Sequence, residues 1–286
     1  MATLKIIRKR ISSVKSTQKI TKAMKMVSAA KLRRAQEAAT AARPYAEKLT
    51  ALLHNVAARV GETTHPLLQT RTEERSVHVL LVTADRGLCG GYNTNLIRKA
   101  EALTQERGRE HVRMTIVGRR GFDYFKKRNV HIVDKHINLF GGPGDALARS
   151  LAEQLAREFA DGTTDGVYLI YSRFRSALVQ VPTVEQLLPI AAESAAGAEA
   201  LDYLYEPNAA GLLDRLLRQY VTVLIHRAFL EAVASEHGAR MTAMDSATSN
   251  ASDMINRLTL DMNRARQATI TKELMEIVGG AEALKG

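Results

Sequence analysis

The first 60 residues of the chain contain no glycine and a single proline, Pro44. Apolar residues recur with the 3-4-3 spacing of one helical stripe, and this stripe continues less strictly further along; its members are Leu4, Ile7, Ile11 and Val14, then Ile20, Met24, Val27 and Leu32. A helix of about 57 residues would be roughly 85 Å long, well beyond the usual globular length. We therefore expect a long rod over residues 1–60, kinked or broken near Ala42 because Pro44 removes a backbone donor.

The charge of the chain is concentrated in the same segment. Its net charge is +11, and the first 36 residues hold eleven Lys and Arg but no Asp or Glu. A stiff basic segment indicates an acidic or polyanionic partner. A basic, acid-free N-terminus is also typical of an organellar presequence, which is one alternative.

Three other uses of the basic rod can be compared. A nucleic-acid-binding zipper would need a strong Leu seam after the basic region, whereas Lys31 is followed by Ala-rich sequence. A helix lying on a membrane surface would need Trp or Phe on its apolar side. A shaft against an acidic protein surface needs only charge, stiffness and a partner helix, and this interpretation fits best.

A second rod is predicted at the C-terminus, over residues 208–286, with Pro207 placed to open the helix. Small and soft residues occupy its a and d positions over four heptads, namely Met241, Met244, Thr248, Ala251, Ile255, Leu258, Met262, Ala265 and Thr269. We expect a slim coiled coil of modest stability, because each small residue buries little apolar surface.

The middle of the chain, residues 75–205, has a different pattern. Apolar strand-like runs alternate with helical stretches, which favours a mainly parallel, Rossmann-like sheet. The expected strands are 77–83, 112–117, 130–133 and 167–171, and the expected helices are 93–106, 122–128 and 145–160. Residues 177–188 are predicted to form an edge strand because Pro182 would disturb a central one. Residues 191–200 are expected to form a loop.

The predicted fold is therefore α/β, with a long antiparallel coiled coil of the N- and C-terminal helices and an α/β foot domain. One long helix enters the middle domain and another leaves it, so helices that pack side by side must be antiparallel. The C-terminal helix should extend past its partner by about 15 to 20 residues, or roughly 25 Å. The expected shape is a spike on a compact foot.

The turn Asp85–Asn93 follows the first strand, where a nucleotide-binding loop would lie, but it lacks the GxGxxG spacing. A tight structural turn is the favoured interpretation, as it is for the Gly141–Gly144 stretch. Cys89 has no His or acid arranged near it in sequence, and the eight His residues are scattered, with none at metal-ligand spacing. We therefore predict no catalytic residue and no metal site, and we expect no cofactor. The single cysteine suits a reducing compartment, and no apolar run reaches the length of a membrane span.

Several motifs together resemble one family, the gamma subunit of the rotary ATP synthase. They run collinearly over nearly the whole chain and comprise residues 11–24, 26–31, 43–45, 85–91, 181–183, 202–207, 265–271 and 276–278. The match begins within the first residues, which argues against a presequence. Plastid members carry an insert with a regulatory cysteine pair, which this chain lacks, so a bacterial member is expected.

The resemblance implies a non-catalytic central-stalk rotor that transmits torque in a proton-translocating ATP synthase. Its implied partners are the alpha and beta subunits, the epsilon subunit and the membrane c-ring, with no nucleic acid and no direct small-molecule substrate. The implied location is peripheral, at the cytoplasmic face of the bacterial inner membrane. A basic coiled-coil nucleic-acid-binding protein is the alternative, and an enzyme that binds nucleotide on the middle domain is a second one.

The resemblance also implies roles for individual residues. Residues matching positions that face the beta subunit are Arg8, Lys9, Arg10, Met24 and Lys25 on the first helix and Arg266, Gln267 and Thr271 on the last. Lys25 replaces the acidic residue that many relatives have. Residues matching the contact with the membrane ring and epsilon are Tyr203, Tyr205 and Glu206.

Overall fold

The computed structural model describes residues 4–60, 65–71, 73–138, 144–190 and 209–283. The chain forms two compact units. The helical unit comprises Met1–Val27 with Met241–Gly286, and the sheet unit comprises Ser28–Arg240. This grouping cuts across both long helices, and the division into domains 1–60, 75–205 and 208–286 remains a prediction.

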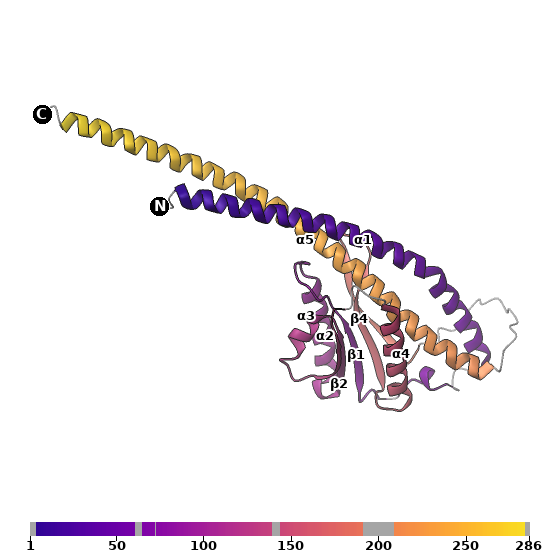
Figure 1. Ribbon diagram of the computed structural model, residues 1–286. Helices are drawn as coiled ribbons and strands as arrows, with labels where there is room; N and C mark the ends of the chain where they lie inside the picture. Colours follow the sequence, from indigo (N-terminus) through magenta and orange to yellow (C-terminus); the bar gives the residue numbers. More distant parts are fainter. Residues whose placement is uncertain (1–3, 61–64, 72, 139–143, 191–208, 284–286) are drawn as a thin grey trace. The chain divides into compact units, whose positions relative to one another are not determined.

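Two helices account for nearly half of the chain (Figure 1). Helix α1 spans Leu4–Val60 and helix α5 spans Ala209–Ala283. Pro44 lies inside α1, so of the kink or break predicted near Ala42 the break is wrong. The helix continues past the proline and curves in its second half (Figure 1). Residues 191–208, which include Pro207 and the predicted loop, lie outside the described residues.

The sheet unit contains a five-stranded sheet of order β3-β2-β1-β4-β5. Its strands are β1 (Val77–Val82), β2 (Val112–Val117), β3 (His131–His136), β4 (Gly166–Phe174) and β5 (Gln180–Leu188). The first four strands pair in parallel, and β5 pairs antiparallel with β4. The mainly parallel sheet and the edge position of β5 are both confirmed. Pro182 stands opposite Ser172 on this edge strand, where a missing donor is tolerated.

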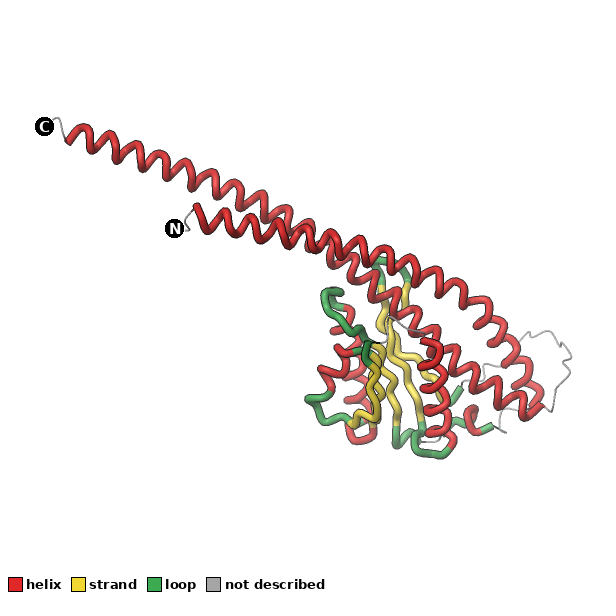
Figure 2. Tube along the Cα trace, viewed as in Figure 1, coloured by secondary structure: helices red, strands yellow, loops and turns green. Residues whose placement is uncertain are grey.

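Helices cover both faces of the sheet (Figure 2). They are α2 (Tyr92–Arg107), α3 (Arg119–Phe125) and α4 (Gly144–Ala160), with short 3-10 turns at Pro66–Leu68 and Arg109–His111. On one face, Leu155 and Phe159 of α4 pack with Ile225 of α5 in one apolar core. On the other face, Leu96 of α2 and Phe125 of α3 belong to a second core.

The central strands supply both cores because their side chains alternate between the two faces. In β1, Leu80 and Val82 belong to the core with α4 and α5, whereas Val79 and Leu81 belong to the core with α2 and α3. All residues of β1 are buried. A strand that is buried on both faces is expected to be almost entirely apolar, as the run Val77–Val82 is apart from His78.

One polar side chain interrupts this apolar strand. His78 is fully buried, its Nδ1 lies 2.9 Å from Glu158 Oε2, and its Nε2 lies 2.9 Å from Thr115 Oγ1. The hydrogen bond from His78 is the main cause that lowers the pKa of Glu158 to about 2. Arg113, 3.6 Å from the same carboxylate, adds to this effect.

This pair predicts a defined acid sensitivity. The pKa of Glu158 is about 2 in the folded chain and 4.5 ordinarily, so its contribution is complete above pH 4.5 and is lost as pH falls towards 2. We expect the loss to reach at most about 3 kcal/mol. Urea unfolding between pH 5 and 2.5 measures it, and Glu158→Gln should flatten that part of the curve. An equally steep curve in the variant would contradict the assignment.

Candidate functional site on the paired terminal helices

In the helical unit, α1 and α5 pair side by side through three cross-helix contacts. Gln18 Nε2 donates to Ser252 Oγ at 2.6 Å, and the hydroxyls of Thr21 and Thr248 are 2.7 Å apart. Lys25 Nζ donates to Asp245 Oδ1 at 2.5 Å. In each pair the two residue numbers add up to 269 or 270, as they must when two helices run in opposite directions. The antiparallel pairing predicted from the sequence is confirmed.

The line of contact on α1, called the seam below, follows a strict heptad pattern. Its buried or half-buried members are Leu4, Ile7, Ile11, Val14, Gln18, Thr21 and Lys25. The apolar stripe predicted from the sequence instead included Ile20 and Val27. That prediction is wrong, because these side chains are 59% and 56% exposed. The regular 3-4 spacing turns polar residues inward and leaves these apolar ones on the outside.

The seam predicted on α5 is confirmed over most of its length. Its members from Met241 to Ala265 are all buried or half-buried, whereas Thr269 is exposed. Thr269 has no counterpart in the described part of α1, which begins at Leu4 and therefore pairs near Arg266. Small residues such as Ala251, which is 7% exposed, let the two backbones approach closely.

Helix α5 continues past this point as a single helix. About 17 residues separate Arg266 from the end of α5 at Ala283, which corresponds to about 25 Å. This agrees with the extension expected from the sequence. All described side chains from residue 266 to 281 are exposed, and they include the apolar residues Ile270, Leu274, Met275, Ile277 and Val278. A lone helix with so much exposed apolar surface indicates a site where another protein binds.

The predicted beta-subunit contacts fall into two groups along the helical unit. Arg8, Lys9 and Arg10 are exposed on the part of α1 that lies near the start of the extension, and Arg266, Gln267 and Thr271 are exposed on the extension itself. Met24 and Lys25 are half-buried and lie about 24 Å away along α1, sixteen residues beyond Arg8.

Lys25 differs from the others because it belongs to the seam. Its side chain is 41% exposed, and the partner carboxylate of Asp245 is 60% exposed. The pair is therefore partly screened by solvent, and its contribution to stability is small. The other group of predicted residues, Tyr203, Tyr205 and Glu206, lies outside the described residues.

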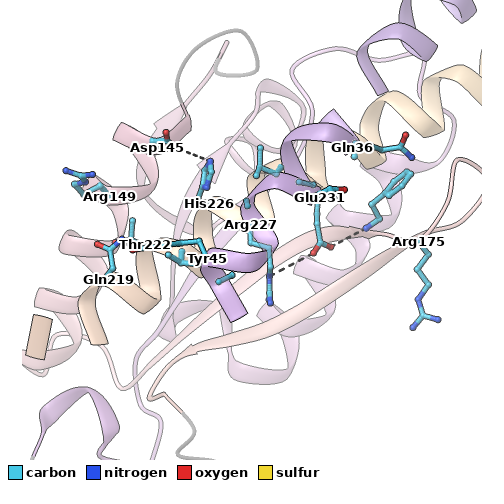
Figure 3. Close-up of a pocket in the computed structure, with 18 residues that line it drawn as sticks. Gln36, Tyr45, Asp145, Arg149, Arg175, Gln219, Thr222, His226, Arg227 and Glu231 are labelled. Atoms are coloured by element: carbon cyan, nitrogen blue, oxygen red, sulfur yellow. Dashed lines mark hydrogen bonds and ion pairs between the residues drawn. The ribbon is translucent and has the colours of Figure 1, made fainter. Parts of the chain in front are cut away.

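The sheet unit contains a cavity of about 620 Å³ between α1, α4 and α5 (Figure 3). Most charged groups facing it are already paired. His226 Nε2 lies 2.6 Å from Asp145 Oδ1, and Arg227 Nη2 donates to Glu185 Oε1 at 2.6 Å. Burial raises the pKa of Glu231, which accepts from the backbone N–H of Phe174 at 3.3 Å. These pairs hold α5 against α4 and the end of β4.

Within the described ranges, no group of three or more His, Cys, Asp or Glu is arranged to hold a metal ion. Among the same residues, no helix is both long enough and apolar enough to cross a membrane.

Comparison with known proteins identifies the class. Residues 3–284 match a family described as ATP synthase. The chain is 52% identical to the ATP synthase gamma chain of Moorella thermoacetica, over all of both chains. The chain therefore belongs to the ATP synthase gamma family, and the resemblance drawn from its motifs is confirmed.

Solved structures agree with this fold. A chain of the Tetrahymena thermophila mitochondrial ATP synthase, from a structure of its central stalk and c-ring, matches with a TM-score of 0.62 and 25% identity, covering 80% of this chain and 99% of that one. A chain of the Euglena gracilis mitochondrial enzyme matches with a TM-score of 0.66 and 20% identity, covering 98% and 94%. The predicted fold class is confirmed.

Proposed function

We propose that this chain is the non-catalytic central-stalk rotor of a proton-translocating ATP synthase. Family membership over the whole chain, together with its paired helices, carries the proposal. Its partners are the alpha and beta subunits, the epsilon subunit and the c-ring. It is peripheral, at the cytoplasmic face of a bacterial inner membrane. The rotor turns with the ring and drives the catalytic subunits through their nucleotide states.

The chemistry of the helical unit supports this use. Polar contacts lie inside the seam, and apolar residues such as Ile20, Met26 and Val27 lie outside at 56–61% exposure. Over residues 18–27 of α1 this is the reverse of an ordinary coiled coil, whereas the seam nearer the N-terminus, from Leu4 to Val14, is apolar. Apolar residues that face outward can contact the surrounding alpha and beta subunits without forming hydrogen bonds. Hydrogen bonds are directional and would hold the rotor in one position. The basic residues of the first 36 positions suit acidic loops on the partner.

We assign the contact with a beta-subunit loop to Arg266, Gln267 and Thr271 at the start of the extension, with Arg8, Lys9 and Arg10 nearby. Their exposure leaves them free to reach another protein. Met24 and Lys25 form the second contact, further along the shaft. Tyr203, Tyr205 and Glu206 are assigned to the contact with the membrane ring and epsilon.

Substitution of the first contact tests the proposal. In a reconstituted complex, Gln267→Ala with Thr271→Ala should lower proton-driven ATP synthesis several-fold, because each side chain loses a hydrogen bond to the partner worth about 1 kcal/mol. Asn256→Ala, an exposed amide on the paired part of α5, is the matched control and should retain full activity. Full synthesis by the double variant would remove Gln267 and Thr271 from the site.

The family match and the relatives give no support to the nucleic-acid alternative. A direct measurement separates the two functions. Binding of the chain to a generic DNA duplex should be weak and should not compete with assembly into the complex. Tight binding that falls as a high power of salt concentration would favour the alternative.

A further inference from the structure

The turn Asp85–Asn93 is a sequence motif to which the function above gives no role. It connects the end of β1 to the start of α2. Its backbone is unusual, since Leu88 and Gly90 have φ values of 63° and 56°. A left-handed conformation at a branched residue such as Leu88 is uncommon, so the surrounding contacts must maintain it.

The side chain of Asn93 forms hydrogen bonds that stabilise the turn from within. The Asn93 Oδ1 atom accepts from the backbone N–H of Ala84 at 3.0 Å, and its Nδ2 donates to Cys89 Sγ at 3.2 Å. The backbone N–H of Tyr92 donates to the carbonyl of Cys89 at 3.2 Å. Cys89 is thereby held inside the turn and is only 2% exposed.

The turn also binds helix α3. Asp85 Oδ1 accepts from the backbone N–H of Arg119 at 2.9 Å, at the first residue of that helix. The next N–H, of Arg120, donates to the carbonyl of Ala84 at 3.1 Å. Free N–H groups at a helix start favour a carboxylate, so this contact fixes α3 to the end of β1.

The turn also forms hydrogen bonds with helix α5. Arg240 donates to the carbonyl of Gly87 from Nε at 3.4 Å and from Nη2 at 3.3 Å, and Nη2 also reaches the carbonyl of Arg86 at 3.5 Å. The buried hydroxyl of Tyr92 donates to the carbonyl of Ala232, two helical turns earlier on α5, at 3.2 Å.

The guanidinium of Arg240 is itself held in place. Glu236 Oε1 lies 2.7 Å from its Nη1, and the two side chains are 7% and 9% exposed. His237 Nδ1 lies 3.4 Å from the same Nη1. All three guanidinium nitrogens are engaged, and a planar fork held on both sides has little freedom to move.

We propose that the turn Asp85–Asn93 is a joint that fastens helix α5 to the sheet at Arg240, in addition to the apolar core and the ion pairs described above, and that Arg240 is the positioning residue through which torque passes between them. The inference rests on the proposed rotor function. Arg240 is the last residue of the sheet unit, and the next residue of α5, Met241, belongs to the helical unit. A twist of α5 would act first on this contact, because no other residue of the sheet unit is nearer in sequence.

Cys89 gives a direct test, since it is the only cysteine in the chain. In the full chain, Arg240→Lys should raise the rate of Cys89 modification by a thiol reagent about tenfold, because lysine keeps the charge but cannot span both carbonyls. Arg218→Lys is the matched control: Arg218 pairs with Asp214 on the same helix at 3.1 Å, and its rate should not change. Tyr92→Phe, which removes only the bond to Ala232, should give a smaller increase. Unchanged rates of Cys89 modification in both Arg240→Lys and Tyr92→Phe would overturn the proposal that the turn is a joint.

The torque role needs a second measurement, on the reconstituted complex. With Arg240→Lys, the number of protons pumped per ATP hydrolysed should fall about twofold while hydrolysis continues, and with Arg218→Lys it should not change. A residue that only stabilised the fold would lower the yield of complex but not this ratio. Faster Cys89 modification with an unchanged ratio would overturn the torque role. Failure of the unsubstituted chain to join alpha and beta subunits would instead count against the proposed function.

Discussion

Replacing Glu236 by leucine is expected to lower the free energy of unfolding by about 3–5 kcal/mol, the cost of leaving one member of a buried ion pair alone. The carboxylate lies 2.7 Å from Arg240, and both side chains are almost fully buried. Burial raises the pKa of Glu236, and the charge of Arg240 opposes that rise. Without the carboxylate, the guanidinium would remain buried with only the longer bonds to His237 and the turn. Urea unfolding at pH 7 measures the loss.

A second pair in the same chain provides the control. Arg33 and Glu37 have the same i,i+4 spacing at 3.0 Å, but their side chains are 83% and 63% exposed. Glu37→Leu should therefore change the free energy of unfolding by less than about 0.5 kcal/mol. Adding Arg240→Leu to Glu236→Leu should recover part of the loss, because no charge is then left buried. Equal effects of the two Glu→Leu variants would show that burial of the pair does not matter.

Lowering the pH from 6.5 to 4 should destabilise the chain through His237. Burial is the main cause that lowers the pKa of this imidazole to about 4, and the positive charges of Arg240 and Lys31 lower it further. The unfolded chain binds a proton near pH 6.5 while the folded chain does not. The contribution is thus complete above pH 6.5 and is lost as pH falls towards 4, to a total of about 3 kcal/mol.

Unfolding curves of the original chain and of His237→Gln separate this effect from other titrations. The variant should lose less stability between pH 6.5 and 4, and the two should run parallel above pH 7. His111→Gln, at a histidine whose side chain is 52% exposed, should behave like the original chain. A variant curve as steep as that of the original chain between pH 6.5 and 4 would rule out His237 as the source. The window overlaps that of Glu158, which lies below pH 4.5, only between pH 4.5 and 4.

Much of the fold was predictable because it depends on local periodicity. Runs such as Val77–Val82 are apolar at every position but one, and the heptads on α5 lack strong helix breakers. The break at Pro44 was not a sound prediction, because a long helix can curve past one lost hydrogen bond when it packs along its length. The sequence pattern of α1 does not show the packing contacts that support the helix at Pro44.

The seam on α1 shows a different limit. Hydrophobicity pointed to Ile20 and Val27, whereas strict spacing from Leu4 leads to Gln18, Thr21 and Lys25. Heptad spacing predicts the seam better than hydrophobicity does, because the geometry of a helix pair determines which positions face the partner, whatever residues occupy them. The polar partners on α5 make those positions stable, and they cannot be known from α1 alone.

The group around Arg240 was missed altogether. Glu236, His237 and Arg240 stand in a polar stretch that resembles the solvated face of a helix, yet all three are buried. Gly238 was the available signal, because a glycine inside a long helix often marks a close approach. A Cβ at that position would lie 3.4 Å from the Cα of Ala177, an ordinary van der Waals distance, so the glycine marks a contact but no clash excludes a side chain there. Contacts between residues more than 140 positions apart in sequence, such as Arg240 with Gly87, need the structure.

The polar contacts of the seam make the two helices resist sliding along each other. A shift by one heptad, about 10 Å, would set Lys25 opposite Ser252 and Thr21 opposite Ile255. The lysine would lose its carboxylate, and the threonine hydroxyl would face a hydrocarbon side chain. A coil with an all-leucine seam would find the shifted alignment nearly as favourable. The polar contacts therefore favour a single register of α1 and α5. Rotation imposed at one end of the helix pair is then transmitted to the other end without the helices sliding past each other.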